Sequence, residues 1–200
     1  VSYNFFYTTI DGQYNATLAL RHPVSTMKPF IYSLALMHGY TRDTVIFDVP
    51  TQFSTNCQPF DTFNNKFPCY APQDYDSKFR GPMTFETDLA QSITIPSIKP
   101  LYLLRIQNTL NLAKSFGLTT LGDPNQYGLT LVLGGGEVRL LDLTGAYSAF
   151  ANDGVLNTPT GILEVDDFQG RALMQYAPKP SRVLPENIAR DMSAMLSDAP

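Results

Sequence analysis

The sequence lacks the features expected of a nucleic-acid-binding or membrane-spanning chain. Its Lys and Arg residues form no dense cluster of the kind that follows a phosphate backbone, and the formal net charge is -4. No apolar run approaches the roughly 18 residues that a helix needs to cross a bilayer. Val1 does not begin a basic and then apolar export signal. We therefore expect no nucleic-acid partner, and any export signal is expected to lie outside these residues.

The sequence contains only two histidines and no internal repeat. His22 and His38 are isolated and are expected to be packing or surface residues rather than metal ligands. The turn at 134–136 lacks the Lys-Ser/Thr of a phosphate-binding loop. No repeat, low-complexity tract or charge block divides the 200 residues. Length and the 44% content of hydrophobic residues therefore favour one globular domain or a large part of one.

The two cysteines, Cys57 and Cys69, lie at either end of a polar stretch that contains Pro and Asn, which is typical of a surface loop. We expect a disulfide here, because two cysteines that close one short loop suit an oxidising compartment. Its closure would stabilise the fold by about 3 kcal/mol in the chain-entropy model. Two unrelated free thiols are the alternative.

Apolar periodicity and capping residues predict the secondary structure. Residues 29–37 read PFIYSLALM and predict a buried central helix. Thr84 can cap a helix that ends near Gln91, with Glu86 and Asp88 in its first turns, where the helix dipole favours acidic residues. Another helix is expected from about Pro96 to Phe116. The other expected elements are a long ordered loop at 41–83, a helix at 140–152, a hairpin at 161–176 and a last helix from Pro185.

Residues 25–28 read STMK, so Ser25 and Lys28 share one face if the segment is helical. Pro29 would clash with the carbonyl of Ser25 deep inside a helix, which places Ser25 at the N-terminal edge. The free N–H groups and dipole of that edge favour an oxyanion formed on an attacked acyl group. Lys28 can activate the serine if burial lowers its pKa. The alternative is a capping serine followed by a solvated lysine.

Three ordered segments resemble the transpeptidase domain of penicillin-binding proteins, whose motifs are S-x-x-K, S-x-N and K-T-G. Residues 21–36 read RHPVSTMKPFIYSLAL and are similar to the pattern R-x-P-G-S-x-x-K-P-F-x-Y, with Val24 in place of Gly. Residues 70–103 read YAPQDYDSKFRGPMTFETDLAQSITIPSIKPLYL and resemble P-x-N-Y-D-x-x-F-x-G-P-V-T followed by S-x-N-I-P, whose serine matches Ser92. Residues 127–154 also resemble the family. The resemblance is to bifunctional, class A-type members, including 1C-like sequences.

The resemblance implies an α/β (α+β) fold of the β-lactamase/transpeptidase-like serine acyltransferase type, here mostly its helical part and incomplete at both ends. Residues 1–200 would form a partial transpeptidase domain. The implied mechanism has Ser25 attack the penultimate D-alanine carbonyl of a peptidoglycan stem peptide. Lys28 would be the acylation base, and Ser92 would relay the proton to the leaving amine. An amine of a neighbouring strand would accept the acyl group, β-lactams would acylate the same serine, and no cofactor or metal would be needed.

The sequence departs from the family in two places. Thr94 stands where the second motif usually has Asn, and one hydroxyl replaces two donors and an acceptor in the substrate-binding contacts. The lost contact is worth about 0.5 to 1.5 kcal/mol, so acylation should be weakened rather than abolished. No K-T-G, K-S-G or H-T-G occurs in the chain. Because that motif forms the other wall of the family's substrate cleft, the fragment alone is expected to be inactive.

The resemblance also implies a place in the cell. We expect an extracytoplasmic domain, in the periplasm or at the outer face of the bacterial membrane, anchored through a missing N-terminal segment. The parent protein is expected to carry a peptidoglycan glycosyltransferase as well. Two other functions of the same ancestry stay open: a β-lactam sensor or non-catalytic wall-binding module, and a β-lactamase.

Overall fold

The computed structural model describes residues 13–197, and these form a helical body with four separate pairs of short strands. The helices are α1 (Lys28–Met37), α2 (Phe85–Gln91), α3 (Thr94–Leu104), α4 (Ile106–Ser115), α5 (Leu140–Ala151) and α6 (Glu186–Ser197), with 3-10 turns η2 (Val24–Met27), η3 (Pro124–Gln126) and η4 (Leu129–Leu133). The antiparallel strand pairs are β1 (Leu20–Arg21) with β4 (Val138–Arg139), β2 (Val45–Asp48) with β3 (Gly81–Thr84), β5 (Val155–Leu156) with β8 (Ser181–Arg182), and β6 (Glu164–Asp166) with β7 (Ala172–Gln175).

Helix α1 is the centre of the body, as its apolar sequence predicts. Every residue from Lys28 to Leu36 is buried, and the helix packs against α3, α4 and α6. Phe30 lies in an aromatic cluster, with ring centroids 5.2 Å from Phe116 and 5.6 Å from Phe150. Burying a large apolar side chain stabilises a fold by about 1.5 to 3 kcal/mol, so this cluster fixes the helix that follows Ser25.

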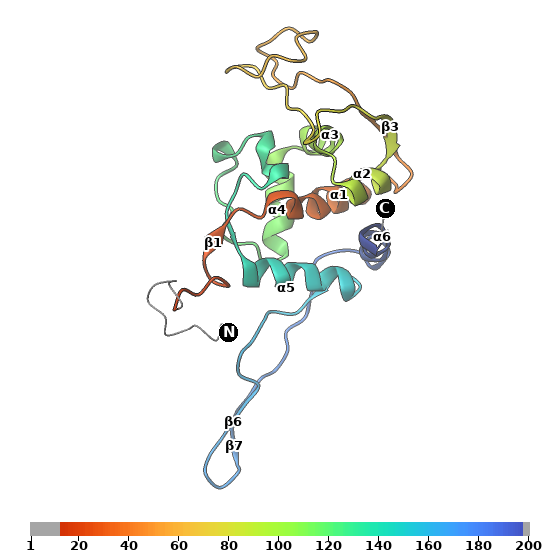
Figure 1. The fold of residues 1–200 in the computed structure, drawn as a ribbon. Helices are drawn as coiled ribbons and strands as arrows, with labels where there is room; N and C mark the ends of the chain where they lie inside the picture. Colours follow the sequence, from red (N-terminus) through yellow and green to blue (C-terminus); the bar gives the residue numbers. More distant parts are fainter. Residues whose placement is uncertain (1–12, 198–200) are drawn as a thin grey trace.

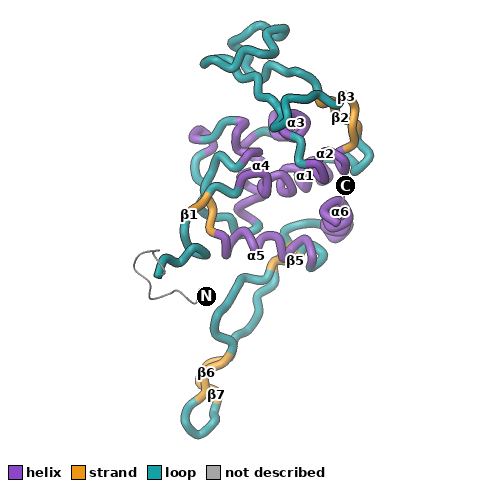
Figure 2. The backbone as a smooth tube through the Cα atoms, viewed as in Figure 1, coloured by secondary structure: helices purple, strands orange, loops and turns teal. Residues whose placement is uncertain are grey.

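Two irregular extensions leave the helical body at opposite ends, as Figures 1 and 2 show. The first is the long loop between β2 and β3, which carries both cysteines. The second is the β6–β7 hairpin, which projects well beyond α5. The hairpin was expected from two strand-like runs around a turn. The loop was expected from its Pro, Asn and Asp content, but over 41–83, and the pairing of β2 with β3 inside that range was not predicted.

The expected helix from Pro96 to Phe116 is wrong as a single element. The chain forms α3 and then α4, with Arg105 between them at φ 70°. A residue with this positive φ and an extended ψ of 144° cannot continue a right-handed helix, so α3 ends here. Pro100 lies inside α3 without ending it.

None of the helices within residues 13–197 has both the length and the apolar character that a bilayer crossing requires.

Candidate active site

Ser25 lies in the 3-10 turn η2, immediately before α1. The peptide N–H of Lys28 donates to the Ser25 carbonyl, and Pro29 occupies the first turn of α1, where a missing N–H does no harm. Residues i and i+3 of a 3-10 turn lie on one face, and Ser25 and Lys28 have this spacing at the junction of η2 and α1. The serine is therefore at the edge of the helix, as expected, but in a tighter turn than an α-helix.

The turn around Ser25 is held by groups from distant segments. Val24 has φ 52°, a conformation in which β-branched residues are rare. A Cβ on Gly134 would lie 2.1 Å from the Val24 nitrogen, so the backbones of η4's cap and η2 touch. Tyr147 of α5 donates its hydroxyl to the Thr26 carbonyl at 2.8 Å. Burial raises the pKa of Tyr147 to about 12, so this donor keeps its proton at neutral pH.

Lys28 is buried, with 1% of its surface exposed, and its ammonium reaches the end of α2. Nζ donates to the carbonyls of Ser92 and Ile93, each at 2.7 Å, and lies 3.2 Å from Ser92 Oγ. The alternative of a solvated lysine is therefore wrong. Ser25 Oγ makes no hydrogen bond to Lys28 or to any other described residue, so the three bonds of the amine all go to Ser92 and Ile93.

Burial lowers the pKa of Lys28 to about 8, and the charges of Asp88 and Asp74 only partly oppose this shift. Roughly one lysine in ten is then neutral at pH 7, against about one in several thousand at the ordinary pKa. A neutral amine is the form that can take a proton from a hydroxyl. The site thus meets the condition under which Lys28 can serve as a base.

Ser92 is positioned by the end of α2. Thr84 is the N-cap of this helix, and its hydroxyl accepts the Thr87 N–H at 3.1 Å. The helix ends before Ser92, which adopts a left-handed conformation at φ 54°. This conformation is a common helix C-cap and turns the chain sharply into α3. The carbonyl and hydroxyl of Ser92 consequently bond to Lys28, while the residue as a whole is exposed.

A buried polar network behind Lys28 was not anticipated. Asp88 was interpreted as an acidic residue that favours the N-terminus of α2, but its side chain is buried and accepts a hydrogen bond from the Tyr32 hydroxyl. Ser97 Oγ lies 3.3 Å from the same carboxylate oxygen and 2.7 Å from the Ile93 carbonyl. Burial raises the pKa of Asp88 to about 7, although Lys28 opposes the shift. The charge of Lys28 is therefore partly balanced by the charge of Asp88, a carboxyl whose pKa is close to neutral pH.

Thr94 is the first residue of α3, beside Ser92, and does not contact Lys28 within hydrogen-bond distance. Its N–H donates to Asp74 Oδ1 at 2.8 Å. Thr94 and Ser92 line a small cavity of about 160 Å³ together with Asp74 and Arg80. Lys28, three residues after Ser25, is thus joined to the Ser92 turn, and Thr94 lies beside that turn, but the lining of this cavity does not include Ser25 or Lys28.

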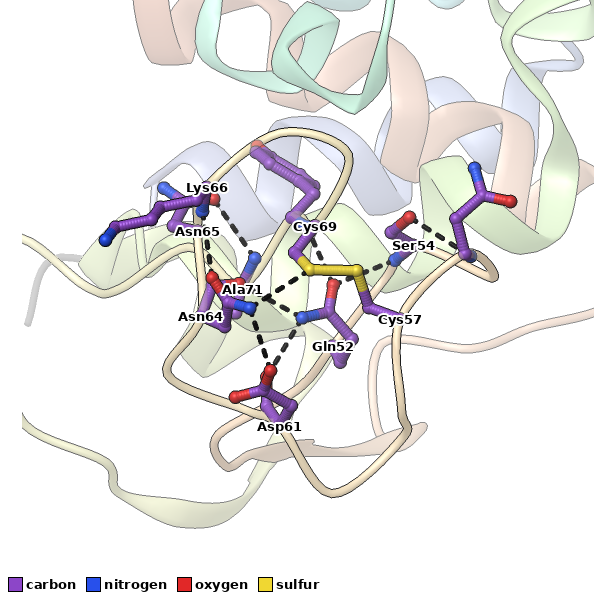
Figure 3. Close-up of a disulfide and its surroundings, with 11 residues drawn as sticks. Gln52, Ser54, Cys57, Asp61, Asn64, Asn65, Lys66, Cys69 and Ala71 are labelled. Carbon is purple, nitrogen blue, oxygen red and sulfur yellow. Dashed lines mark hydrogen bonds between the residues drawn. A yellow bond between two sulfur atoms is a disulfide. The ribbon is translucent and has the colours of Figure 1, made fainter.

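The long loop carries a disulfide between Cys57 and Cys69, with an S–S distance of 1.97 Å and a Cα–Cα distance of 5.6 Å (Figure 3). Gln52 orders the loop, because its amide donates to the carbonyls of Asp61 and Asn64 at 2.9 and 3.1 Å. A cavity of about 690 Å³ lies between residues 51–59 and α3. Its lining does not include the serine and lysine residues of the candidate site.

The described residues contain no group of three or more His, Cys, Asp or Glu side chains that could hold a metal ion. His22 Nδ1 lies 3.0 Å from the Gly134 carbonyl, and His38 Nδ1 lies 2.8 Å from the Leu34 carbonyl, so each histidine has a backbone partner. What the site does offer is a serine at a helix N-terminus, a buried amine and a second hydroxyl. Such an arrangement suits nucleophilic acyl transfer.

Comparison with known proteins places this arrangement in context. Residues 12–199 match the family model described as the penicillin binding protein transpeptidase domain. The chain is 34% identical over 163 residues to penicillin-binding protein 1A of Neisseria flavescens, covering 82% of this chain and 19% of that protein. It is 31% identical over 182 residues to penicillin-binding protein 1A of Pseudomonas aeruginosa, covering 90% of this chain and 21% of that protein. The chain therefore spans about a fifth of the length of these curated relatives.

Solved structures share the fold. Penicillin-binding protein 1A from Haemophilus influenzae superposes with a TM-score of 0.78 at 24% identity, covering 93% of this chain and 31% of that one. The imipenem acyl-enzyme complex of penicillin-binding protein A from Mycobacterium tuberculosis superposes with a TM-score of 0.78 at 12% identity, covering 96% of this chain and 47% of that one. The α/β transpeptidase fold expected from the sequence is confirmed.

Proposed function

Given that the chain belongs to the penicillin-binding protein transpeptidase family, we propose that it is part of a peptidoglycan D,D-transpeptidase domain that acts through an acyl-enzyme on Ser25. The observation that carries the proposal is the buried Lys28, three residues after Ser25, whose amine holds the Ser92 turn with three hydrogen bonds.

The reaction follows from these positions. The neutral amine of Lys28 takes the proton of the Ser25 hydroxyl as Oγ attacks the penultimate D-alanine carbonyl, and free N–H groups at the start of α1 favour the oxyanion. The bond to the terminal D-alanine breaks, and Ser92 passes the proton from Lys28 to the leaving amine. The amine of a neighbouring stem peptide then attacks the ester and gives its proton to Lys28. Lys28 passes this proton to Ser25 Oγ as the ester bond breaks, which regenerates the serine hydroxyl and the neutral lysine. No step needs a metal or cofactor.

We propose the same serine as the site of β-lactam acylation. A β-lactam presents a strained carbonyl to the same nucleophile, and opening of the ring keeps the leaving amine attached to the adduct. The Mycobacterium tuberculosis relative with the same fold is an imipenem acyl-enzyme, which supports this chemistry for the fold. Thr94 would contact the substrate with one hydroxyl in the place of an amide.

The remaining parts of the proposal concern the whole protein. We propose that residues 1–200 are part of one transpeptidase domain and that the parent protein is a periplasmic or cell-surface enzyme with a membrane anchor and a glycosyltransferase. The support is the match to penicillin-binding protein 1A, of which this chain spans about a fifth. Without a K-T-G wall the 200 residues alone should not turn over substrate.

Labelling of the full-length protein with a fluorescent penicillin tests the nucleophile. The wild-type protein should label, and Ser25→Ala should not. Thr26→Ala is the matched control, because Thr26 is the adjacent hydroxyl and bonds to the Pro23 carbonyl. Labelling of Ser25→Ala, or a folded wild-type protein that does not label, would contradict the proposal.

The pH dependence of acylation tests the base. Because the pKa of Lys28 is lowered to about 8, the acylation rate should rise with pH and level off above a midpoint near 8. Lys28→Met, which keeps the buried stem but has no amine, should lose at least about a thousandfold in rate. A rate that stays constant from pH 6 to 9 would show that Lys28 is not the base.

A sensor or non-catalytic module is the second candidate, favoured by Thr94, which lacks the amide that would bind Lys28 and substrate together. Two assays separate the candidates. A transpeptidase releases D-alanine from a stem pentapeptide, whereas a sensor forms a stable penicillin adduct without D-alanine release. Steady hydrolysis of nitrocefin would instead indicate a β-lactamase.

A further inference from the structure

Two sets of hydrogen bonds, one from Lys28 and one to Asp74, hold the turn that carries Ser92. On one side, Lys28 Nζ donates to the carbonyls of Ser92 and Ile93. On the other side, Asp74 Oδ1 accepts the N–H groups of Thr94 and Ile95 at 2.8 and 3.1 Å. The carbonyls thus face the lysine and the next two amides face the aspartate. A shift of this turn would break one set of contacts or the other.

Asp74 supplies a helix cap that the local sequence lacks. Ile93, the N-cap residue of α3, has an apolar side chain and forms no side-chain cap. The first N–H groups of a helix have no partner within it, and a carboxylate at that end satisfies them and favours the dipole. Asp74 reaches this position from the long loop, and only 4% of its surface is exposed. The loop therefore has a structural link to the candidate site.

Asp48 and Arg80 lie next to the Asp74 carboxyl. Asp48, at the end of β2, is fully buried and accepts the Arg80 N–H at 2.8 Å. Arg80 Nη1 lies 3.6 Å from Asp48 Oδ2 and 4.0 Å from Asp74 Oδ2. Asp48 Oδ1 and Asp74 Oδ2 are buried and form no hydrogen bond within the described part of the chain. Burial is the main cause that raises the pKa of Asp74 to about 6, and the neighbouring Asp48 carboxyl adds to the shift.

We propose that Asp74 is a positioning residue, whose carboxyl fixes the Ser92 turn against Lys28 while Asp48 and Arg80 keep that carboxyl in place. The catalytic part of this inference rests on the proposed function, whereas the capping part does not. The family pattern quoted above has Asn at the position of Asp74. An amide oxygen can accept the same two N–H groups without a charge, which makes Asp74→Asn the natural rescue variant.

Hydrogen exchange measures the cap directly, in the chain itself and without any assay of activity. Asp74→Ala should lower the protection of the Thr94 and Ile95 amides by about tenfold or more, because they lose their acceptor. Asp74→Asn should keep protection within about threefold of wild type. Asp123→Ala is the matched control, because Asp123 caps η3 by accepting the Asn125 N–H at 2.9 Å and should leave both amides unchanged.

Acylation by penicillin in the full-length protein measures the positioning. Asp74→Ala should lower the acylation rate constant by about tenfold or more, with little change in the affinity of the non-covalent complex, while Asp74→Asn stays within about threefold of wild type. Asp123→Ala should acylate normally. If Asp74→Ala does not fold, Asp74→Asn decides: preserved exchange and acylation support the proposal, and loss of either contradicts it.

The outcomes separate this inference from the proposed function. Unchanged protection of Thr94 and Ile95 in folded Asp74→Ala would overturn the cap. Reduced protection with normal acylation would overturn the positioning role. If the wild-type protein and every variant fail to acylate, the proposed function fails, and the exchange results still decide whether Asp74 holds the turn.

Discussion

The left-handed conformation of Val24 predicts an unusual order of stability for small residues beside the nucleophile. At ordinary positions Gly is less stable than Ala by about 0.5 to 1 kcal/mol, because it loses more chain entropy on folding. Val24 has φ 52°, where any residue with a Cβ carries about 1 to 2 kcal/mol of strain. The order should therefore reverse, and Val24→Gly should be more stable than Val24→Ala.

The magnitude follows from a comparison in which other terms cancel. Both variants remove the same side-chain branches, which are 56% exposed in Val24, so lost burial contributes almost equally to each. Relief of Cβ strain minus the entropy cost of Gly leaves about 0.5 to 1 kcal/mol in favour of Val24→Gly. For a chain of this size, that difference corresponds to a melting temperature about 1 to 4 °C higher.

Thermal unfolding followed by circular dichroism is the assay, and Thr26 is the matched control. Thr26 lies in the same turn with negative φ, so Thr26→Ala should be more stable than Thr26→Gly. Gly134→Ala should be strongly destabilising, because its Cβ would lie 2.1 Å from the Val24 nitrogen. If Val24→Ala equals or exceeds Val24→Gly in stability, the strain assigned to this turn is absent.

Three further changes test other contacts. The pKa of Asp88 is raised to about 7, so the free energy of unfolding should fall as pH rises from about 4 to 7. In urea titrations at several pH values, Asp88→Asn should reduce this fall. An unchanged dependence on pH would contradict the prediction. Tyr147→Phe loses the hydrogen bond to the Thr26 carbonyl and should lower the free energy of unfolding by about 1 kcal/mol in the same titrations. An unchanged free energy of unfolding would show that this bond does not stabilise the turn. Replacing Cys57 and Cys69 with Ser should cost about 3 kcal/mol, and reduction of the wild type should have the same effect; equal stability would refute this.

Local signals in the sequence predicted the elements that position the nucleophile. Pro29 limited Ser25 to the start of α1, and Thr84 marked the start of α2, because both effects act within one turn of a helix. Arg105 shows the limit of such signals. It is neither Gly nor Asn, so nothing in its identity indicates the positive φ that separates α3 from α4.

The surroundings of Lys28 could not be predicted, because they come from distant segments. Its hydrogen-bond partner Ser92 is 64 residues away, and the resemblance to a family motif, rather than any spacing, pointed to it. Asp88 was correctly placed on α2, but a helical position alone does not say whether a carboxyl faces solvent or the core. Asp74 caps α3 from a loop whose path depends on tertiary packing.

Peptide mapping of the penicillin adduct tests the central claim most directly. Trypsin does not cleave before Pro29, so Ser25 falls in the peptide 22–42, which also contains Thr26 and Ser33. After brief treatment of the full-length protein with penicillin, this peptide should gain the mass of one penicillin, and fragmentation should place it on Ser25. An adduct on any other residue of this peptide, such as Thr26, Ser33 or Thr41, or on another peptide would contradict the assignment of Ser25 as the nucleophile.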